Sequence, residues 1–473
     1  MSIIKQTDNF NANFGEVLRS SAIFWIPDSQ TTKTTISLAN YWKFKNSLDV
    51  AIIVTWRSLS GKLLKRHKVE FLNVLNLICP FENFEGSCEI ETFSLKNLRI
   101  PYSAIMAVYE TQKSISMVHS YTRTYSHHEI EEERTITDGH ESCWTIYSGN
   151  IESFAIGHNG NQAISQQLCT LYIRRYDDRE ISKKFTLKEL NPYETFKIKP
   201  SEIIPNLEDF LDGKPGNARV DFNLMGAFTR LLCCNQLQDK SELQVTHSNF
   251  DYSQHSTDFV ETDISQATAY MVIPPEISDT RFEVIVYPDR SPGEYLAGDK
   301  IMQPVEDILS FPVEGNSVIG FRRVDNKLPS RIVTALRLYS QSSKSSLLAE
   351  CSLGVIHSKR PGKHFHWMLV SGLYETYILF TAITEIYSDV PSNLELCLTL
   401  YSQSQKEAIS KKYGMEFFET IQSNPVSLKS IFEQCDRYLG RDFGYLSIWS
   451  SYPGFVIYSV LRKNNSVTIE HSF

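Results

Sequence analysis

The sequence predicts an all-β protein of four tandem, diverged β-sandwich repeats of the Ig-like type, each carrying a short helical turn. Aromatic residues make up 12% of the chain, with 23 Tyr and 27 Phe, and this composition favours strands. A strand-like apolar segment that stops on the dipeptide His-Ser recurs four times. The segments before it recur in the same order, so internal duplication explains the pattern.

The recurring dipeptide gives the domain boundaries. Its histidines are His119, His247, His357 and His471. Their spacing suits a sandwich module of about 100 residues. We therefore place the repeats at residues 1–118, with an N-terminal arm, and at 119–246, 247–356 and 357–473.

Upstream of each His-Ser lies a short segment whose apolar residues are three and four apart, a spacing typical of one or two helical turns. These segments span residues 71–78, 204–211, 303–309 and 424–432. Short strands separated by turn residues follow each of them, which favours a two-sheet sandwich over a parallel sheet with long helices. No Pro/Gly/Ser-rich linker separates the repeats, so neighbouring repeats are expected to share interfaces.

Composition and charge exclude several classes of protein. The net charge of −8 argues against nucleic-acid binding, and the basic cluster at 62–68 is interpreted as a solvent-facing turn or strand end. The 9 cysteines follow no disulfide framework and include no CxxC pair. With no signal-peptide pattern and no stretch of 18 apolar residues, we expect a cytoplasmic protein without a transmembrane segment. A cell-surface or viral structural role is left open.

The chain has 12 histidines, and most of them cluster around the repeat junctions. Two imidazoles from strands that meet at a turn, joined by a carboxylate, are typical ligands of zinc or non-haem iron. His364 and His366, two residues apart on a strand, would point to the same face. The candidate metal ligands are His119, His128, Glu132, His247, His255, His364 and His366.

A structural role is the competing interpretation of these histidines. Each ring would hydrogen-bond a backbone carbonyl at a junction, and the following serine would close the turn. Recurrence in all four repeats favours this role, because a catalytic site is seldom built four times. The third junction also replaces the acidic residues with Lys359, Arg360 and Lys363. No cofactor is therefore expected, with zinc or iron as the alternative.

The function predicted from the sequence is a non-catalytic scaffold or binding protein that presents loops to a protein or glycan partner. The glycine-containing segment at 157–161 is interpreted as a hairpin turn, and the acidic run at 129–134 as a solvated loop. No nucleophile elbow of the G-x-S-x-G type is present. The alternative is a metal-dependent enzyme with His119, His128 and a nearby glutamate as ligands. The sequence does not indicate the oligomeric state.

Overall fold

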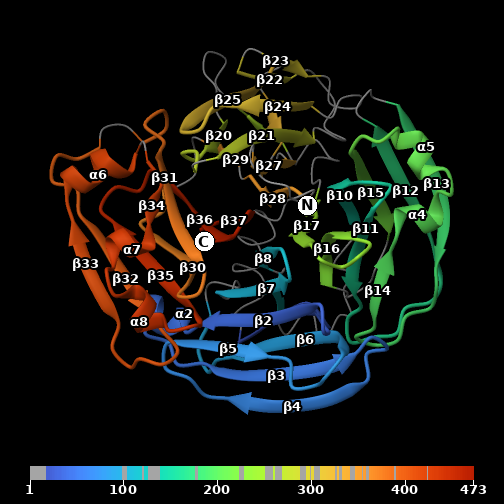
Figure 1. The fold of residues 1–473 in the computed structure, drawn as a ribbon, viewed down its shortest axis with the longest axis horizontal. Helices are drawn as coiled ribbons and strands as arrows, with labels where there is room; N and C mark the ends of the chain where they lie inside the picture. The colour runs from blue at the N-terminus through green and yellow to red at the C-terminus, as the bar shows by residue number, and fades with distance from the viewer. Residues whose placement is uncertain are drawn as a thin grey trace.

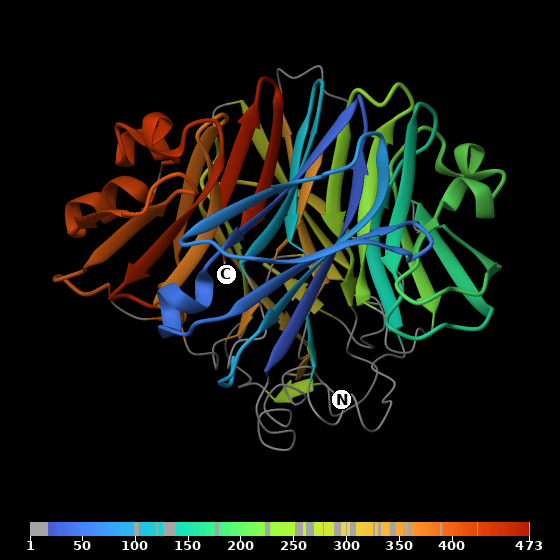
Figure 2. The same ribbon diagram turned by 90° about the horizontal axis from the view of Figure 1, so that it is seen from below.

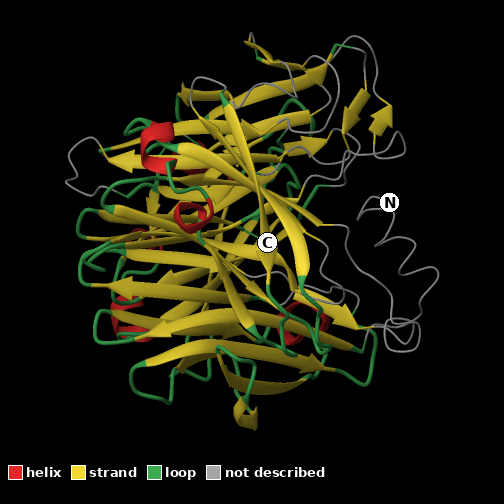
Figure 3. Cartoon of the chain, turned by 90° about the vertical axis from the view of Figure 1, so that its right-hand side faces the viewer, coloured by secondary structure: helices red, strands yellow, loops and turns green. Residues whose placement is uncertain are grey.

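The four repeats form four β-sandwich modules arranged in a ring (Figure 1). The structure is a computed structural model that describes residues 18–98, 104–119, 122–125, 139–175, 179–222, 228–250, 259–261, 269–277, 279–287, 295–298, 300–302, 309–324, 327–329, 333–340, 347–353, 355–357, 362–387, 390–422 and 424–472. The predicted all-β fold of tandem sandwich repeats is confirmed. Strands dominate the described residues, and the helices are short (Figure 3).

Module 1 has an outer sheet of order β4-β3-β6-β1-β9 and an inner sheet of order β5-β2-β7-β8. Its elements are β1 (Arg19–Asp28), β2 (Thr32–Ala39), α2 (Tyr41–Asn46), β3 (Ala51–Ser58), β4 (Leu63–Val69), β5 (Val74–Ile78), β6 (Phe84–Phe93), β7 (Ile105–Thr111), β8 (Ile115–His119) and β9 (Thr122–Tyr125).

Module 2 repeats this arrangement with the orders β13-β12-β15-β10-β18 and β14-β11-β16-β17. Its elements are β10 (Gly139–Ile146), β11 (Ile151–His158), β12 (Gln167–Arg175), β13 (Glu180–Leu187), β14 (Thr195–Ile198), α4 (Pro200–Ile203), α5 (Leu207–Leu211), β15 (Gly216–Phe222), β16 (Phe228–Leu237), β17 (Leu243–His247) and β18 (Asn249–Phe250).

Module 3 has the orders β23-β22-β25-β20-β29 and β24-β21-β27-β28, with a separate ribbon of β19 and β26. Its elements are β19 (Phe259–Glu261), β20 (Ala269–Ile273), β21 (Thr280–Tyr287), β22 (Tyr295–Ala297), β23 (Lys300–Met302), β24 (Leu309–Val313), β25 (Ser317–Arg323), β26 (Lys327–Pro329), β27 (Val333–Ser340), β28 (Ala349–Ser352) and β29 (Val355–His357).

Module 4 has the orders β30-β35-β32-β33 and β34-β31-β36-β37. Its elements are β30 (Phe365–Ser371), β31 (Glu375–Ala382), β32 (Leu396–Tyr401), β33 (Ile409–Tyr413), α6 (Met415–Ile421), β34 (Val426–Ser427), α7 (Leu428–Ile431), α8 (Cys435–Leu439), β35 (Phe443–Ser450), β36 (Phe455–Lys463) and β37 (Ser466–His471).

The common strand order does not confirm the Ig-like type. In an immunoglobulin domain the first two strands share one sheet. Here the first two strands of modules 1, 2 and 4, such as β1 and β2, lie in opposite sheets. The strands β9 and β18 follow the predicted boundaries at 118 and 246, yet they pair with β1 and β10 of the preceding module.

The burial pattern explains why the two sheets have different sequences. In the outer sheets, β32 and most of β12 alternate between buried and more exposed residues, because one face packs on the core and the other faces outward. In the inner sheets, β7 and β36 are buried almost continuously. An inner sheet packs on its own module and on its neighbours, so both of its faces require apolar residues.

Two of the four predicted helical turns are confirmed by the structure. The turn expected at 204–211 is confirmed by α5, and the one at 424–432 by α7. The turn expected at 71–78 is wrong, because Val74–Ile78 forms strand β5 and pairs with β2. Tertiary pairing with an open sheet edge outweighs a weak local helical pattern. Of the segment 303–309, residues 303–308 lie outside the described residues and Leu309 begins β24.

The last strands of the inner sheets, β8, β17, β28 and β37, meet at the centre of the ring (Figures 1 and 2). Side-chain hydroxyls bind the backbone edges that these central strands leave unpaired. Ser116 Oγ donates to the Val245 carbonyl at 3.0 Å and accepts from the Val245 amide at 2.8 Å. Thr468 Oγ1 accepts from the Met117 amide at 3.0 Å. These bonds satisfy buried backbone groups without continuing a sheet from one module into the next.

Within the described part of the chain, apolar contacts join module 1 to module 2, module 4 to module 1 and module 4 to module 3. Trp25 and Phe154 pack edge to face at 5.6 Å between modules 1 and 2. Tyr445 of module 4 packs in a cluster with residues of module 1, and Tyr458 of module 4 packs with residues of module 3. A polar contact joins modules 2 and 3, in which Arg337 donates to Thr145 Oγ1 at 2.5 Å. The ring is therefore one packed body rather than a flexible string.

Strands at the outer rim carry exposed lysines. β4, which contains the basic cluster, is exposed along most of its length and forms a sheet edge, as expected for a solvent-facing strand. Lys183 on β13 and Lys412 on β33 are exposed on the corresponding edge strands. Lysine on an open edge discourages pairing with a second chain. Among the described residues, no helix is long and apolar enough to cross a membrane.

Candidate functional site

Three of the central strands end on histidine at the centre of the ring. β8 ends at His119, β17 at His247 and β37 at His471. Each of these strands pairs with the neighbouring strand of its own inner sheet, which fixes the position of its histidine. The residues paired with the three histidines are Met106 for His119, Leu232 for His247 and Tyr458 for His471. The three imidazoles therefore come from modules 1, 2 and 4 and converge at one place.

After His247 and after His471, the next residue closes the strand by a backbone hydrogen bond. The Ser248 amide donates to the Leu231 carbonyl at 2.9 Å, and the Ser472 amide donates to the Ile457 carbonyl at 2.7 Å. In module 3 the equivalent bond is made by Leu353, whose amide donates to the Thr334 carbonyl at 3.0 Å. Ser352 therefore occupies the position that is histidine in the other modules.

The third His-Ser is thus not equivalent to the others. His357 lies on β29, which pairs with β20 in the outer sheet of module 3. As expected, a strand stops on the third His-Ser, because β29 ends at His357, but this strand is not the central strand of module 3. Strand pairing, rather than the local sequence, decides which strand of a module reaches the centre.

Glu470 completes the central group, which we call the hub cluster: His119, His247, Glu470 and His471. One ligand atom from each residue lies within 4.8 Å of one from every other. His119 Nδ1 is 3.2 Å from Glu470 Oε1, and His471 Nε2 is 3.5 Å from the same oxygen. The imidazole of His119 lies edge to face with that of His247 at 4.5 Å and with that of His471 at 5.2 Å.

The environment of the hub cluster favours uncharged side chains. Burial lowers the pKa of His247 well below its usual value, and the nearby Arg230 guanidinium lowers it further. Burial lowers the pKa of His471 to about 4, against the opposing effect of Glu470. Burial also raises the pKa of Glu470 to about 7. Neutral imidazoles can accept a hydrogen bond or bind a metal ion.

Hydrogen bonds orient the rings of the hub cluster. His247 Nδ1 is 2.8 Å from the Ser248 carbonyl, and His471 Nδ1 is 3.3 Å from the Ser472 carbonyl. A carbonyl can only accept, so Nδ1 of each ring carries the hydrogen and Nε2 carries the lone pair. Arg230 Nη1 donates to His119 Nε2 at 3.2 Å.

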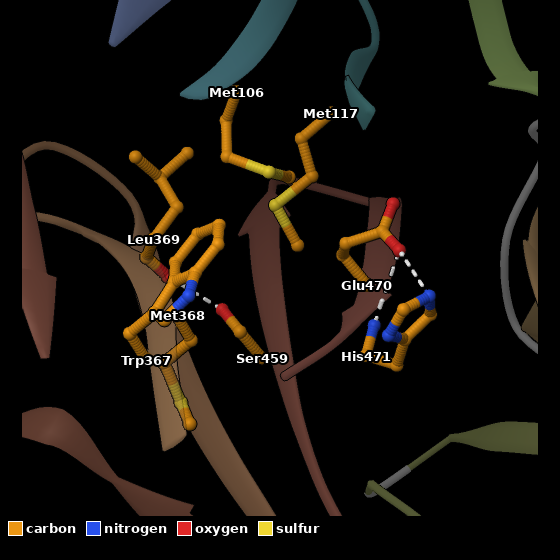
Figure 4. A pocket seen from close by; sticks show the side chains of 8 residues that line it. All are labelled: Met106, Met117, Trp367, Met368, Leu369, Ser459, Glu470 and His471. Carbon is orange, nitrogen blue, oxygen red and sulfur yellow. Dashed lines mark hydrogen bonds and ion pairs between the residues drawn. The ribbon is translucent and has the colours of Figure 1, made fainter. Parts of the chain in front are cut away.

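A narrow pocket adjoins the hub cluster on the side of module 4 (Figure 4). Figure 4 shows the Glu470 carboxylate directed at the backbone and ring of His471, while the remaining wall is mainly apolar. The pocket has essentially no space for a water molecule. On this side the cluster is therefore closed to a substrate. The pocket is lined by Met106, Met117, Trp367, Met368, Leu369, Ser459, Glu470 and His471.

The structure brings together two of the predicted site residues, His119 and His247. His128, Glu132 and His255 lie outside the described residues, so the metal-dependent enzyme that would use His128 stays a prediction. Sequence reasoning did not select Glu470 or His471. His471 carried a signal, since it belongs to the fourth His-Ser, whereas Glu470 differs in type from the residue before each other histidine.

His364 and His366 do not form a shared site. His364 is exposed just before β30, and its Nδ1 is 2.8 Å from the Ser450 carbonyl. His366 is buried, with Nδ1 2.9 Å from Ser472 Oγ and Nε2 3.2 Å from the Lys363 carbonyl. Both ring nitrogens of His366 are thus in hydrogen bonds. This is the arrangement that the structural interpretation of the histidines expects.

Acid is expected to destabilise the protein through His366. Burial, together with the charge of Lys363, lowers the pKa of His366 to about 3. In the unfolded chain a histidine titrates near pH 6.5, so below that pH the unfolded state binds more protons and stability falls as pH falls. We expect His366 to contribute a loss of about 1.4 kcal/mol per pH unit between pH 6 and pH 4. Urea denaturation across this range measures the slope.

The variant His366→Gln is expected to reduce this acid slope, because glutamine does not titrate. The matched control is His364→Gln, two residues away on an exposed side chain, which is expected to keep the wild-type slope. Equal slopes in wild type and His366→Gln would show that His366 is not a source of the acid destabilisation.

Comparison of the sequence with protein-family models and with curated proteins finds no match to either.

Proposed function

We propose that the chain is a non-catalytic scaffold whose ring of sandwiches binds a protein or glycan partner through an exposed aromatic surface. The observation that supports this function is the exposure of Trp449. Of the 6 tryptophans, Trp449 is 42% exposed, whereas the other five are buried. Exposed tryptophan is typical of binding surfaces, since it supplies a large apolar face at low entropic cost.

The surroundings of Trp449 favour recognition rather than accidental exposure. Trp449 lies on β35 in the outer sheet of module 4, directly opposite Phe365 on one side and Cys397 on the other. The Phe365 ring lies 6.1 Å from that of Tyr41 on helix α2 of module 1. Lys45 Nζ lies 5.2 Å from the centre of the Phe365 ring. Aromatic faces beside an ammonium group suit a sugar ring or an aromatic and acidic protein segment.

The position of this surface at the seam between modules 1 and 4 also supports the proposal. Both modules are joined there by a buried apolar cluster. A surface held by two packed modules loses little conformational freedom on binding, which favours affinity. The ring would thus act as the rigid support and Trp449 as the anchor.

Fluorescence quenching provides a direct test, because Trp449 is the exposed tryptophan. We expect a bound glycan from an array, or a bound protein, to shield Trp449 from acrylamide. Photocrosslinking from position 449 would identify a protein partner, and the purified complex would then be titrated. The variant Trp449→Ala is expected to weaken binding at least tenfold, as for a typical interface anchor.

The matched control is Leu168→Ala, which removes a leucine that is 68% exposed on the outer sheet of module 2. This variant is expected to bind as wild type does. Binding that Trp449→Ala leaves unchanged would overturn the proposed surface. A chain for which neither array nor crosslinking gives a partner that shields Trp449 would overturn the proposed function.

A further inference from the structure

We propose that the hub cluster binds one zinc ion, with His119, His247, Glu470 and His471 as the four ligands. This site goes beyond the scaffold function and does not depend on it. Three imidazoles and one carboxylate form a donor set that suits zinc in proteins. The four residues come from three modules, so a bound ion would join the first, second and last modules at the centre of the ring.

The geometry lies close to that of a four-coordinate site. With metal–ligand bonds of about 2.0–2.1 Å, two ligand atoms of a tetrahedral zinc are about 3.3 Å apart. The distances from Glu470 Oε1 to His119 Nδ1 and to His471 Nε2 are 3.2 Å and 3.5 Å, which match this edge. The remaining separations lie within 4.8 Å and require only a modest contraction.

An unsatisfied nitrogen points to a ligand at this place. His247 Nε2 is buried and has no hydrogen-bond partner within the described part of the chain. A buried polar atom without a partner is costly unless an ion or water satisfies it. The Ser248 carbonyl holds the hydrogen on Nδ1, so the lone pair of Nε2 is free for coordination. The Ser472 carbonyl gives His471 the same orientation.

The serines after His247 and His471 thus have a role in the site. The amide of each closes the strand, and its carbonyl fixes the tautomer of the preceding imidazole. Outer hydrogen bonds of this kind are usual for histidines that bind metal ions. Burial keeps His247 and His471 neutral at physiological pH, which is the form that coordinates.

Arg230 opposes metal binding at the hub cluster. Its guanidinium donates to His119 Nε2 at 3.2 Å and places a positive charge beside the cluster. When His119 coordinates through Nδ1, its Nε2 carries a hydrogen, so Arg230 must turn away from the ring. Zinc and Arg230 therefore compete, and Arg230→Gln is expected to increase zinc affinity at least fivefold.

A closed set of four protein ligands in a buried place is typical of a structural zinc site rather than a catalytic one. The pocket beside Glu470 and His471 has essentially no space for water. A bound ion would stabilise the folded ring by mass action, because the unfolded chain holds His119, His247 and His471 far apart.

Metal content and cobalt spectroscopy test the proposal in the full chain. We expect about one equivalent of zinc after dialysis against a zinc-containing buffer, and its removal by a chelator. Cobalt(II) added to the chelated protein is expected to give the intense visible bands of a tetrahedral site. His247→Ala and Glu470→Gln are each expected to lower zinc affinity at least a hundredfold, whereas the surface variant His364→Ala keeps it.

Glu470→Gln keeps the size of the side chain and removes its charge. Circular dichroism checks that each variant is folded, so that a loss of zinc is not caused by unfolding. Zinc is expected to raise the urea midpoint of wild type and not that of Glu470→Gln. A wild-type protein without stoichiometric zinc and without tetrahedral cobalt bands would overturn the site. The site would also be overturned if both ligand variants retained zinc, or if Arg230→Gln lowered the zinc affinity. These readouts do not involve Trp449, so they fail or succeed separately from the proposed function.

Discussion

Replacement of Tyr445 by alanine is expected to lower the free energy of unfolding by about 3–5 kcal/mol, the usual cost of deleting a buried aromatic side chain. Tyr445 lies on β35 of module 4 and is fully buried against module 1. Its hydroxyl donates to the Ser37 carbonyl on β2 at 2.7 Å, and its ring packs 5.7 Å from that of Trp367. This contact joins the last module to the first, so its loss weakens closure of the ring.

Urea denaturation followed by circular dichroism measures the loss, and small-angle scattering measures the radius of gyration of the native protein. Tyr445→Phe is expected to cost only about 1 kcal/mol, since it removes the hydrogen bond and keeps the ring. Trp449→Ala is the matched control on the same strand and face, and we expect it to change stability by about 0.5 kcal/mol or less. A cost for Trp449→Ala equal to that of Tyr445→Ala would contradict the packing of Tyr445 between modules 1 and 4.

The sandwich fold was predictable because its signals are local. Strands such as β12 and β32 alternate between buried and part-exposed residues, and period-two alternation is visible in any short window of sequence. The recurrence of such strands around short turns then predicts repeated sandwiches. The helical turn predicted at 71–78 was wrong because the interaction that determines its structure is not local. Five of its residues, Val74–Ile78, form a strand because they pair with β2, and β2 lies far from them in the sequence.

The candidate site was predictable only in part, because it forms when the ring closes. His119 and His247 were selected because their dipeptide recurs, and recurrence is a property of the sequence. His357 shares the dipeptide but lies on an outer strand, whereas Ser352 holds the equivalent central position. Glu470 reaches His119 only because β37 and β8 meet at the centre. Contacts between residues that are separated by whole modules produce no periodic pattern in the sequence, so they could not be predicted from it.

The second large effect is expected at Arg57, which forms a buried ion pair in module 1. Arg57 Nη2 is 3.0 Å from Glu89 Oε2, and both side chains are buried. Ser21 Oγ donates to the other carboxylate oxygen of Glu89 at 2.7 Å, and the Arg57 guanidinium lies 3.9 Å from the centre of the Tyr193 ring of module 2. Arg57→Leu leaves the Glu89 carboxylate buried without its cation, so we expect a loss of about 3–5 kcal/mol.

The double variant Arg57→Leu with Glu89→Met separates the cost of an unpaired charge from the value of the pair itself. An ion pair replaced as a whole by apolar residues of similar size is often close to neutral, because the desolvation of both charges is avoided. We therefore expect the double variant to recover most of the stability that Arg57→Leu loses, as measured by urea denaturation. If the double variant is as unstable as the single one, the stacking of Arg57 on Tyr193, rather than its pairing with Glu89, is what stabilises the contact between modules 1 and 2.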